Sequence, residues 1–322
     1  MEDHTRLGKV AESPTIPGRV HEKRGFDIAD LYDKPAGAAA DKGDALTGLD
    51  EKLRKAYFWI ANYAIINPFC DIEYNQTPPN RYIIGDSKSG VTLPTAQSYA
   101  SFILFPLLTL VTRRKCLLVG GPGRGKTSSA MIMGLLAGYS MKEIKRSVQH
   151  GQPQMTVSDL LGNPLPSDMV SAKSMDDIKI AWRKWLPMKV KIIDEYNRIP
   201  ARTQSALLNV MSENYAELLD QVYDCPEAAW FLTANDDAGG GTYQVIEALR
   251  DRIDIVVQAL HFNTRFLPDL LDRVERGIKP EEAVPPEIIF TEEEINAINR
   301  EILDIEIPRQ LMRRIEYFAS QF

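Results

Sequence analysis

The sequence is poor in the residues that build disulfide frameworks and metal centres. Its 322 residues include only four histidines and three cysteines, Cys70, Cys116 and Cys225. The cysteines are scattered and odd in number, and no C-x-x-C pair occurs, so they predict reduced thiols in a cytoplasmic protein. The histidines show no paired ligand spacing. A disulfide scaffold and a structural zinc site are therefore both disfavoured.

Long hydrophobic runs and an excess of positive charge are also lacking. The most apolar stretch, residues 98–111, is too short to span a bilayer, contains Pro106 and precedes a basic tripeptide. We therefore expect a buried helix there and no membrane span. No secretory signal is visible before Phe26. The net charge of −6 gives no footprint for general nucleic-acid binding, although a local basic surface stays open.

What is present is a glycine-rich phosphate-loop pattern. Residues 120–127 fit G-x-x-x-x-G-K-[ST], between an apolar strand-like stretch and a helix-like one. Backbone N–H groups of such a turn converge on a phosphate at a helix N-terminus. The residues expected to hold the nucleotide are Gly121, Pro122, Gly123, Arg124, Gly125, Lys126, Thr127 and Ser128.

Two of these side chains have specific expected roles. Lys126 would reach the β- and γ-phosphates, and the Thr127 hydroxyl would bind Mg²⁺. The alternative is a glycine-rich turn that binds nothing, which Lys and Thr in register after the last glycine make the weaker interpretation. The sequence thus predicts a site for a nucleoside triphosphate, ATP, with Mg²⁺.

An acidic pair follows a second apolar strand. Asp194 and Glu195 close the stretch 188–195. Asp194 would hold Mg²⁺ through water, and Glu195 would act as the general base that polarises the attacking water. Alone, such acids are more often the end of a strand at a solvated loop. Their position about 68 residues after Lys126 in an αβ sequence favours the ATPase interpretation.

Further polar residues complete the predicted site. Asn235 follows the apolar stretch 230–234. Its amide could hydrogen-bond the lytic water and the γ-phosphate, or the residue could simply form a turn. Arg250 and Arg252 lie at the end of a short helix-like stretch. They fit either a surface salt-bridge cluster or an arginine finger that reaches a neighbouring subunit's ATP.

The chain divides into four predicted regions. Residues 1–48 are polar and read as a flexible arm, and residues 49–113 as a helical segment that packs on the core. Residues 114–260 alternate strands with helices, which indicates a parallel sheet covered by helices. Residues 261–322 begin a helical region that looks incomplete. The expected strands are 82–84, 116–119, 190–193, 230–233, 253–257 and one near 144–149, and the expected helices are 49–67, 94–112, 127–136, 265–276, 291–302 and 308–322.

Taken together, these motifs resemble the MoxR family of AAA+ ATPases. Residues 194–208 are similar to the family's D-E-I-N-R-x-P-x-K-T-Q-S-A-L-L, and residues 157–162 to its P-S-D-L-L-G. Gly241-Thr242-Tyr243, followed by Glu247-Ala248 and Asp251-Arg252, is similar to E-G-T-Y-x-L-x-E-A-x-L-D-R-F. The resemblance is strong over residues 115–258, weak beyond them and absent from about the first ninety residues.

This resemblance implies an α/β fold, an AAA+ P-loop core with a five-stranded parallel sheet, followed by a partial all-helical lid. It implies hydrolysis of Mg-ATP in a ring, usually a hexamer. It places Asp194 and Glu195 at the Walker B pair, Asn235 at sensor 1 and Arg252 at the finger, with Arg250 as an extra candidate. No residue is assigned to sensor 2.

The resemblance also implies two hairpins that face the pore of a ring. The first would pair residues 169–172 with 178–182 around the turn 173–177, and the second would lie around residues 218–225. The family further implies a chaperone-like activity that remodels a partner protein, and a protein with a von Willebrand factor A domain is the partner that the resemblance implies. Two alternatives stay open. One is a nucleic-acid motor, a helicase or translocase, with Lys173, Lys179 and Lys184 as pore lysines. The other is an ATP-switched scaffold, which an intact Glu195 disfavours.

Overall fold

The computed structural model describes residues 48–64, 82–84, 91–93, 100–174, 177–235, 245–259, 267–277, 279 and 284–321. The predicted N-terminal arm lies outside the described residues except for Gly48. The Gly241-Thr242-Tyr243 segment that contributes to the family resemblance also lies outside them. Within the described part of the chain, no helix is both long and apolar enough to cross a membrane.

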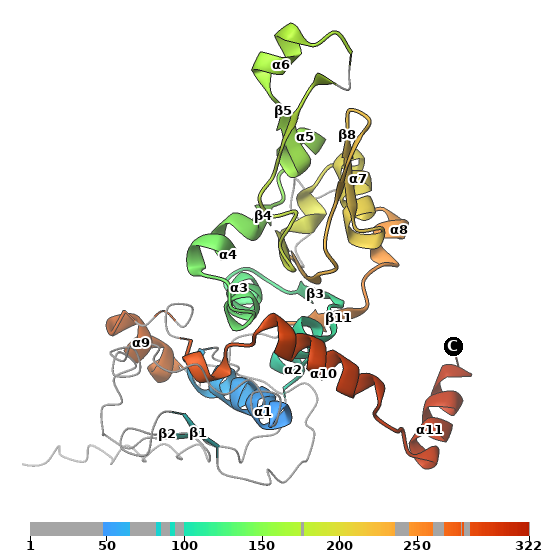
Figure 1. Cartoon of the computed structure of the whole chain (residues 1–322). Helices are drawn as coiled ribbons and strands as arrows, with labels where there is room; N and C mark the ends of the chain where they lie inside the picture. Colours follow the sequence, from blue (N-terminus) through green and yellow to red (C-terminus); the bar gives the residue numbers. More distant parts are fainter. Residues whose placement is uncertain are drawn as a thin grey trace, which may run out of the picture.

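A five-stranded parallel sheet forms the centre of the molecule (Figure 1). Its strand order is β11-β3-β10-β7-β4, and every neighbouring pair is parallel. The strands are β3 (Lys115–Val119), β4 (Val148–His150), β7 (Val190–Asp194), β10 (Ala229–Ala234) and β11 (Ile255–Gln258). The three central strands are buried apolar runs, as expected when helices cover both faces of a sheet. The predicted α/β fold class is confirmed.

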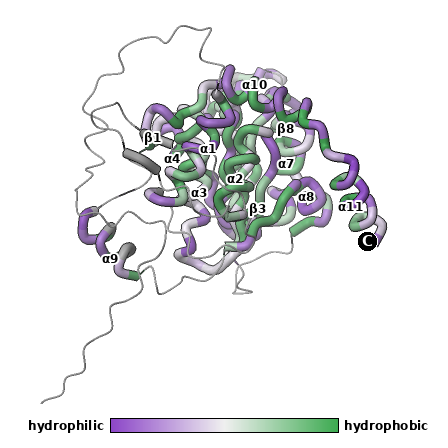
Figure 2. The backbone as a smooth tube through the Cα atoms, turned by 90° about the horizontal axis from the view of Figure 1, so that it is seen from below, coloured by the Kyte–Doolittle hydropathy of each residue, from purple (hydrophilic) through white to green (hydrophobic). Residues whose placement is uncertain are grey.

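Alternate residues of the strands enter two separate cores. Leu118 and Phe231 pack in a cluster with α1 (Leu49–Trp59), α2 (Ser101–Thr112), α3 (Lys126–Leu136) and α10 (Glu292–Leu303). Leu117 and Leu232 point the other way, into a cluster with α5 (Val157–Leu161), α7 (Ala201–Ser212) and α8 (Glu247–Arg250). Successive side chains of a strand point to opposite faces, so helices cover both sides. The predicted buried helix is α2, whose tube is largely green in Figure 2.

One strand lies elsewhere than the sequence predicts. The strand expected near residues 144–149 is β4, and it begins only at Val148 because α4 (Met141–Ser147) occupies the preceding residues. Ser140 starts this helix with a capping box, in which Glu143 N–H donates to the Ser140 hydroxyl and the Glu143 carboxylate accepts from Ser140 N–H.

The first predicted hairpin is wrong in one strand. β6 (Ile180–Trp182) pairs antiparallel with β5 (Gly162–Pro164), whereas residues 169–171 belong to the helix α6 (Pro166–Ser171). Pro166 at the first helical position favours that helix. Only glycine fits at position 162, because a Cβ there would lie 2.7 Å from the Ala181 carbonyl oxygen. The exposed apolar side chains of Met169 and Val170 are therefore on a helical tip, not on a strand.

The second predicted hairpin is confirmed. β8 (Tyr215–Leu218) pairs with β9 (Gln221–Asp224), and the turn between them consists of Leu219 and Asp220. Both turn residues have positive φ, 51° and 59°. This is the backbone conformation of tight hairpin turns, which glycine or asparagine usually supplies.

The remaining elements lie outside the sheet. β1 (Tyr82–Ile84) pairs with β2 (Val91–Leu93), and the π-helix η2 (Ile60–Ala64) extends α1. The 3-10 helices of the described residues include η4 (Tyr196–Arg198) and η7 (Pro286–Ile288). The helical C-terminal part consists of α9 (Leu267–Glu275), α10 and α11 (Arg309–Ala319), which confirms the three helices predicted there. Every residue of α11 is exposed, including Leu311, Ile315 and Phe318.

Candidate nucleotide-binding site

The phosphate-loop residues form the turn between β3 and α3. The chain passes so close to the end of β11 that a Cβ at Gly120 would lie 2.7 Å from the Ala259 carbonyl oxygen. Gly125, immediately before α3, has φ 72°, a conformation that costs glycine little. Arg124 Nη1 donates to the same Ala259 oxygen at 2.8 Å. The loop is thereby fixed to the sheet, and its exposed residues Pro122 and Gly123 face solvent.

Lys126 begins α3 and is 7% exposed. Its ammonium donates to the carbonyl oxygens of Gly120 at 2.5 Å and Gly121 at 2.8 Å, and to Asn235 Oδ1 at 2.9 Å. Phosphate oxygens are stronger partners for an ammonium than neutral carbonyls. A nucleotide in the loop would therefore find its cation already in place.

Asp194 lies at the end of β7, next to the start of α3. Its Oδ1 accepts from the hydroxyls of Thr127 and Thr233, each at 2.7 Å. Its Oδ2 lies 3.1 Å from His150 Nδ1, at the end of β4. The two residues predicted to hold the metal, Thr127 and Asp194, are thus brought together.

This donor set fits Mg²⁺. A hydroxyl and a carboxylate are hard oxygen ligands, and Mg²⁺ commonly binds one or two such groups together with water and phosphate oxygens. The described residues contain no group of three or more His, Cys, Asp or Glu side chains that could hold an ion alone. The arrangement suits a metal that arrives with a nucleotide rather than one caged by protein.

Glu195 is held in an unusual backbone conformation. It has φ 53° and ψ 48°, the left-handed region that non-glycine residues rarely adopt. Its N–H donates to the Thr233 hydroxyl at 2.9 Å, Oε1 accepts from Asn235 Nδ2 at 2.7 Å, and Oε2 lies 3.2 Å from Arg198 Nε. These contacts fix both the backbone and the carboxylate.

Asn235 is the link between the two motifs. It follows β10, the strand between β3 and β7, and its amide bonds Lys126 through Oδ1 and Glu195 through Nδ2. The predicted position of Asn235 beside both motifs follows from this strand order, because the carboxyl ends of parallel strands meet at one edge of the sheet.

Sequence reasoning missed three residues of the site: Thr233, His150 and Gly151. Gly151 N–H donates to the Asp194 carbonyl oxygen at 2.7 Å, and a Cβ at Gly151 would lie 2.2 Å from the Glu195 carbonyl oxygen. Thr233, a polar residue within an apolar strand, was a visible signal. His150 and Gly151 give no such signal, because the sequence pattern predicts the strand near residues 144–149, whereas β4 begins only at Val148.

Arg250 and Arg252 do not reach this site within the chain. Both are exposed, at the end of α8 and just after it. Among the described residues, no hydrogen bond or ion pair joins either guanidinium to Lys126, Asp194 or Glu195. Ser128 is exposed on α3, next to Thr127.

Comparison with known proteins agrees with this geometry. Residues 115–255 match the model of the ATPase family associated with various cellular activities (AAA). Chaperone MoxR1 of Mycobacterium tuberculosis is 27% identical over 149 residues, which are 45% of this chain and 36% of that protein. The chain thus spans about a third of that relative's length.

Two solved structures also align. A proposed ATPase of Cytophaga hutchinsonii aligns with a TM-score of 0.48 and 22% identity, over 66% of this chain and 62% of the other. NtrX of Brucella abortus in complex with ATP aligns with a TM-score of 0.36 and 16% identity, over 58% and 42% of the two chains.

Residues 115–255, which match the AAA family model, also form the phosphate-loop turn, so this part of the chain is similar to an AAA-type ATPase domain. Within that class, the chain is similar to the MoxR type in its motifs and in the relative that it matches.

Proposed function

We propose that this domain hydrolyses Mg-ATP. The observation that supports it best is the continuous chain of contacts from Lys126 through Asn235 to Glu195, at the edge where β3, β10 and β7 end. These contacts connect the Lys126 ammonium, which would bind the phosphates, to the Glu195 carboxylate, which would act on the water. A turn that binds nothing has no need of such a connection.

Each side chain has a distinct proposed role. Lys126 and the loop N–H groups bind the phosphates, and Thr127 and Asp194 hold Mg²⁺, which neutralises charge on the phosphates when bound. Glu195 takes a proton from the attacking water, and Asn235 orients that water. The contact of Asn235 with both Lys126 and Glu195 means that phosphate binding at Lys126 releases or redirects the amide, and with it the carboxylate.

The arginines suggest that the site is completed by a second subunit. Arg250 and Arg252 are exposed and, among the described residues, make no hydrogen bond or ion pair with Asp194 or Glu195, which fits a finger that reaches a neighbour's ATP. We propose a homo-oligomeric ring, a hexamer by analogy with the family. The buried thiols Cys116 and Cys225 are free, as suits the proposed cytoplasmic location.

We further propose that hydrolysis remodels, activates or assembles a partner protein, as the name of the chaperone relative suggests. A protein with a von Willebrand factor A domain is one candidate client. A nucleic-acid motor is the second candidate function, supported by the exposed Lys173, Lys179 and Lys184 on and near the β5–β6 insert. An ATP-switched scaffold is the third.

The decisive experiment compares Lys126→Ala and Glu195→Gln. The first should lose ATP binding, measured by calorimetry. The second should keep ATP binding and slow phosphate release by about a hundredfold or more, the usual scale for removal of a general base. Lys142→Ala, an exposed lysine on α4, serves as the matched control. Wild-type turnover in the Glu195→Gln variant would disprove the role of Glu195.

The same variant identifies the client. Glu195→Gln should trap ATP and client together, so that proteins and nucleic acids recovered with it can be identified by mass spectrometry and sequencing. The affinity for a nucleic-acid client should fall steeply with salt because counterions are released, whereas binding of a protein client through apolar contacts should not. Salt-steep, ATPase-stimulating binding of DNA or RNA would establish the motor function instead.

A further inference from the structure

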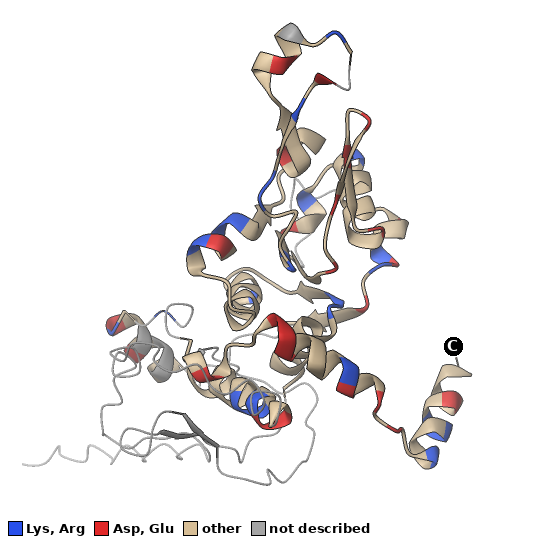
Figure 3. Ribbon diagram, viewed as in Figure 1, with Lys and Arg blue, Asp and Glu red and all other residues tan. Residues whose placement is uncertain are grey.

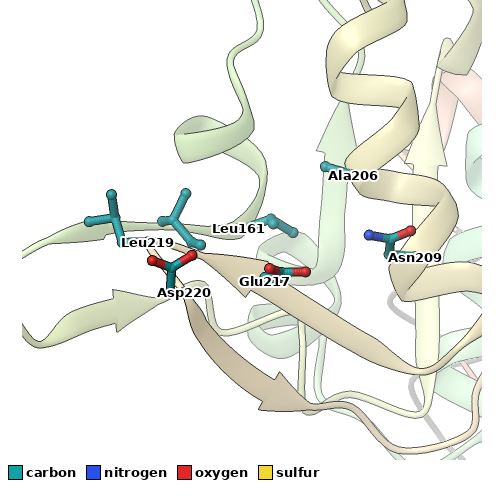
Figure 4. Close-up of a pocket in the computed structure, with 7 residues that line it drawn as sticks. Leu161, Ala206, Asn209, Glu217, Leu219 and Asp220 are labelled. Carbon is teal, nitrogen blue, oxygen red and sulfur yellow. The ribbon is translucent and has the colours of Figure 1, made fainter. Parts of the chain in front are cut away.

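A cavity of about 370 Å³ lies between α7 and the hairpin β8–β9, and none of its lining residues belongs to the candidate nucleotide site (Figure 4). One wall comes from α7, one from the end of α5 and one from the hairpin turn. The residues that form these walls include Leu161, Ala206, Asn209, Glu217, Leu219 and Asp220.

The cavity combines an apolar surface with uncompensated negative charge. Leu161, Leu219 and Ala206 supply the apolar part. The carboxylates of Glu217 and Asp220 make no ion pair or hydrogen bond with any other described residue. No lysine, arginine or histidine occurs between residues 203 and 249 of the sequence, whereas acids recur along the hairpin, where Figure 3 shows red. The lining therefore favours a ligand that is both apolar and basic.

The hairpin that forms one wall of the cavity is attached to the neighbouring segment around β6. Gln221 Nε2 donates to the Ile178 carbonyl oxygen at 2.5 Å, which ties β9 to the segment just before β6. The rings of Trp182 and Tyr223 lie 5.5 Å apart and join the same two segments. A preformed site loses less conformational entropy on binding than one that must be ordered.

We propose that this cavity binds a partner protein through a segment in which an arginine or lysine lies next to leucine-like side chains. The aliphatic groups would cover the leucines, and the cation would pair with Glu217 and Asp220. A volume of this size is at the low end of ligand sites and accommodates a few side chains, not a folded domain.

The cavity is connected to the candidate nucleotide site through α7. Gln204 on this helix donates to the Ile199 carbonyl oxygen at 2.8 Å and accepts from Ile246 N–H at 2.9 Å. The first contact lies four residues after Glu195, and the second fixes the start of α8, which carries Arg250. A ligand that packs against Ala206, two residues after Gln204, would therefore lie on the helix that contacts the segments of both Glu195 and Arg250. This coupling rests on the proposed ATPase activity, whereas binding itself does not.

Binding is tested without nucleotide, so that it can fail or succeed independently of hydrolysis. The probe is a fluorescent decapeptide of alternating leucine and arginine, titrated with the full chain and read by anisotropy. Glu217→Gln with Asp220→Asn removes the charge, and Ala206→Phe fills the cavity and keeps the charge. Each variant should weaken binding about tenfold or more, as expected for the loss of a central interface contact. Glu213→Gln with Asp224→Asn, which removes two nearby acids that do not line the cavity, should change affinity less than about twofold.

Three results would overturn the proposal. The first is no saturable binding of the probe up to about 1 mM, the weakest affinity class considered. The second is equal weakening by the Glu213/Asp224 control, which would show general attraction to an acidic surface. The third is unchanged binding in Ala206→Phe. If binding is confirmed and the probe leaves ATP turnover unchanged, the cavity is a docking site and the coupling through α7 is wrong.

Discussion

At the scale of single residues, the most unusual group is a lysine inside the sheet. Lys191 on β7 is fully buried, and its ammonium donates to the carbonyl oxygens of Leu186 at 2.9 Å and Met188 at 2.5 Å. It also lies 5.9 and 5.7 Å from the ring centroids of Trp185 and Trp230. Burial lowers the pKa of Lys191 from the ordinary 10.5 to about 8.

This shift predicts a pH dependence of stability. Between pH 8 and 10.5 the unfolded chain holds the lysine proton and the folded chain releases it, so the free energy of unfolding rises with pH. The contribution reaches about 3 kcal/mol at most. Burial raises the pKa of Cys116 from 9.0 to about 12, which has the opposite effect from pH 9 upward. The rise is therefore clearest between pH 8 and 9.

Lys191→Met should abolish this rise, measured as urea-unfolding free energies at pH 7, 8 and 9. Lys184→Met, which changes an exposed lysine, should keep it. If the free energies of unfolding of wild type and Lys191→Met change in parallel with pH, the conclusion that burial lowers the pKa of Lys191 is wrong.

Gly151 is a second residue whose effect can be predicted. A Cβ at this position would lie 2.2 Å from the backbone carbonyl oxygen of Glu195 and 3.1 Å from that of Asp194. Gly151→Ala must therefore displace the acidic pair. We expect turnover to fall by about tenfold to a hundredfold, because a shift of about an ångström is enough for such a loss.

In the Gly151→Ala variant, ATP affinity should stay nearly unchanged, since Lys126 and its loop are not displaced. The assay is kcat against KM for ATP, with circular dichroism as a check of folding. Gln152→Ala, the exposed neighbour, should behave as wild type. An unaltered kcat in folded Gly151→Ala would show that the close approach does not matter.

At the scale of elements, α10 is attached to the core by its acidic first turn. Thr291 and Glu294 form a capping box. The Glu294 carboxylate, in a residue that is 8% exposed, accepts two hydrogen bonds from Lys52 Nζ of α1, at 2.7 and 2.8 Å. Glu292 pairs with Arg113, which follows α2, and with Lys189 at 2.7 Å. Acidic residues also suit a helix N-terminus. Thus this helix packs on the core, although it lies in the C-terminal region.

Glu294→Gln should lower the free energy of unfolding by about 1 to 3 kcal/mol, because it leaves a partly buried lysine without its charged partner. The glutamine can still complete the capping box, so the loss isolates the ion pair. Glu293→Gln, an exposed neighbour, should change stability by less than about 0.5 kcal/mol. Urea denaturation of both variants measures the difference, and equal stability would contradict the role of the pair.

At the scale of the whole molecule, the question is whether one chain holds a complete site. Arg252 is exposed and makes no hydrogen bond or ion pair with Glu195 among the described residues, so we expect it to act on a neighbour. Arg252→Ala should keep ATP affinity and reduce turnover by roughly a thousandfold.

Mixing inactive variants tests this directly. An Arg252→Ala subunit keeps its own Glu195, and a Glu195→Gln neighbour supplies the missing arginine, so the mixture should regain activity that neither variant has. Arg276→Ala, an exposed arginine of the C-terminal part, is the control for charge loss. Failure to regain activity in a mixture that light scattering shows to co-assemble would rule out catalysis between subunits.

The sequence by itself determined the phosphate loop, the acidic pair and most strands of the sheet. These signals are local: glycines before Lys126 define a turn, and an apolar run that ends at Asp194 defines a buried strand with acids at its end. Asn235 could be placed beside them because parallel strands end at the same edge.

Only the tertiary structure decided which residues meet across the chain. Trp182 pairs with Gly162 and not with the predicted segment around Met169. Gly151, which follows β4, lies against the backbone of Glu195 at the end of β7. The roles of Thr233 and His150 around Asp194 also appear only when three strands are in register. Strand pairing depends on packing and backbone hydrogen bonds between distant segments, and no local pattern of residues encodes that register.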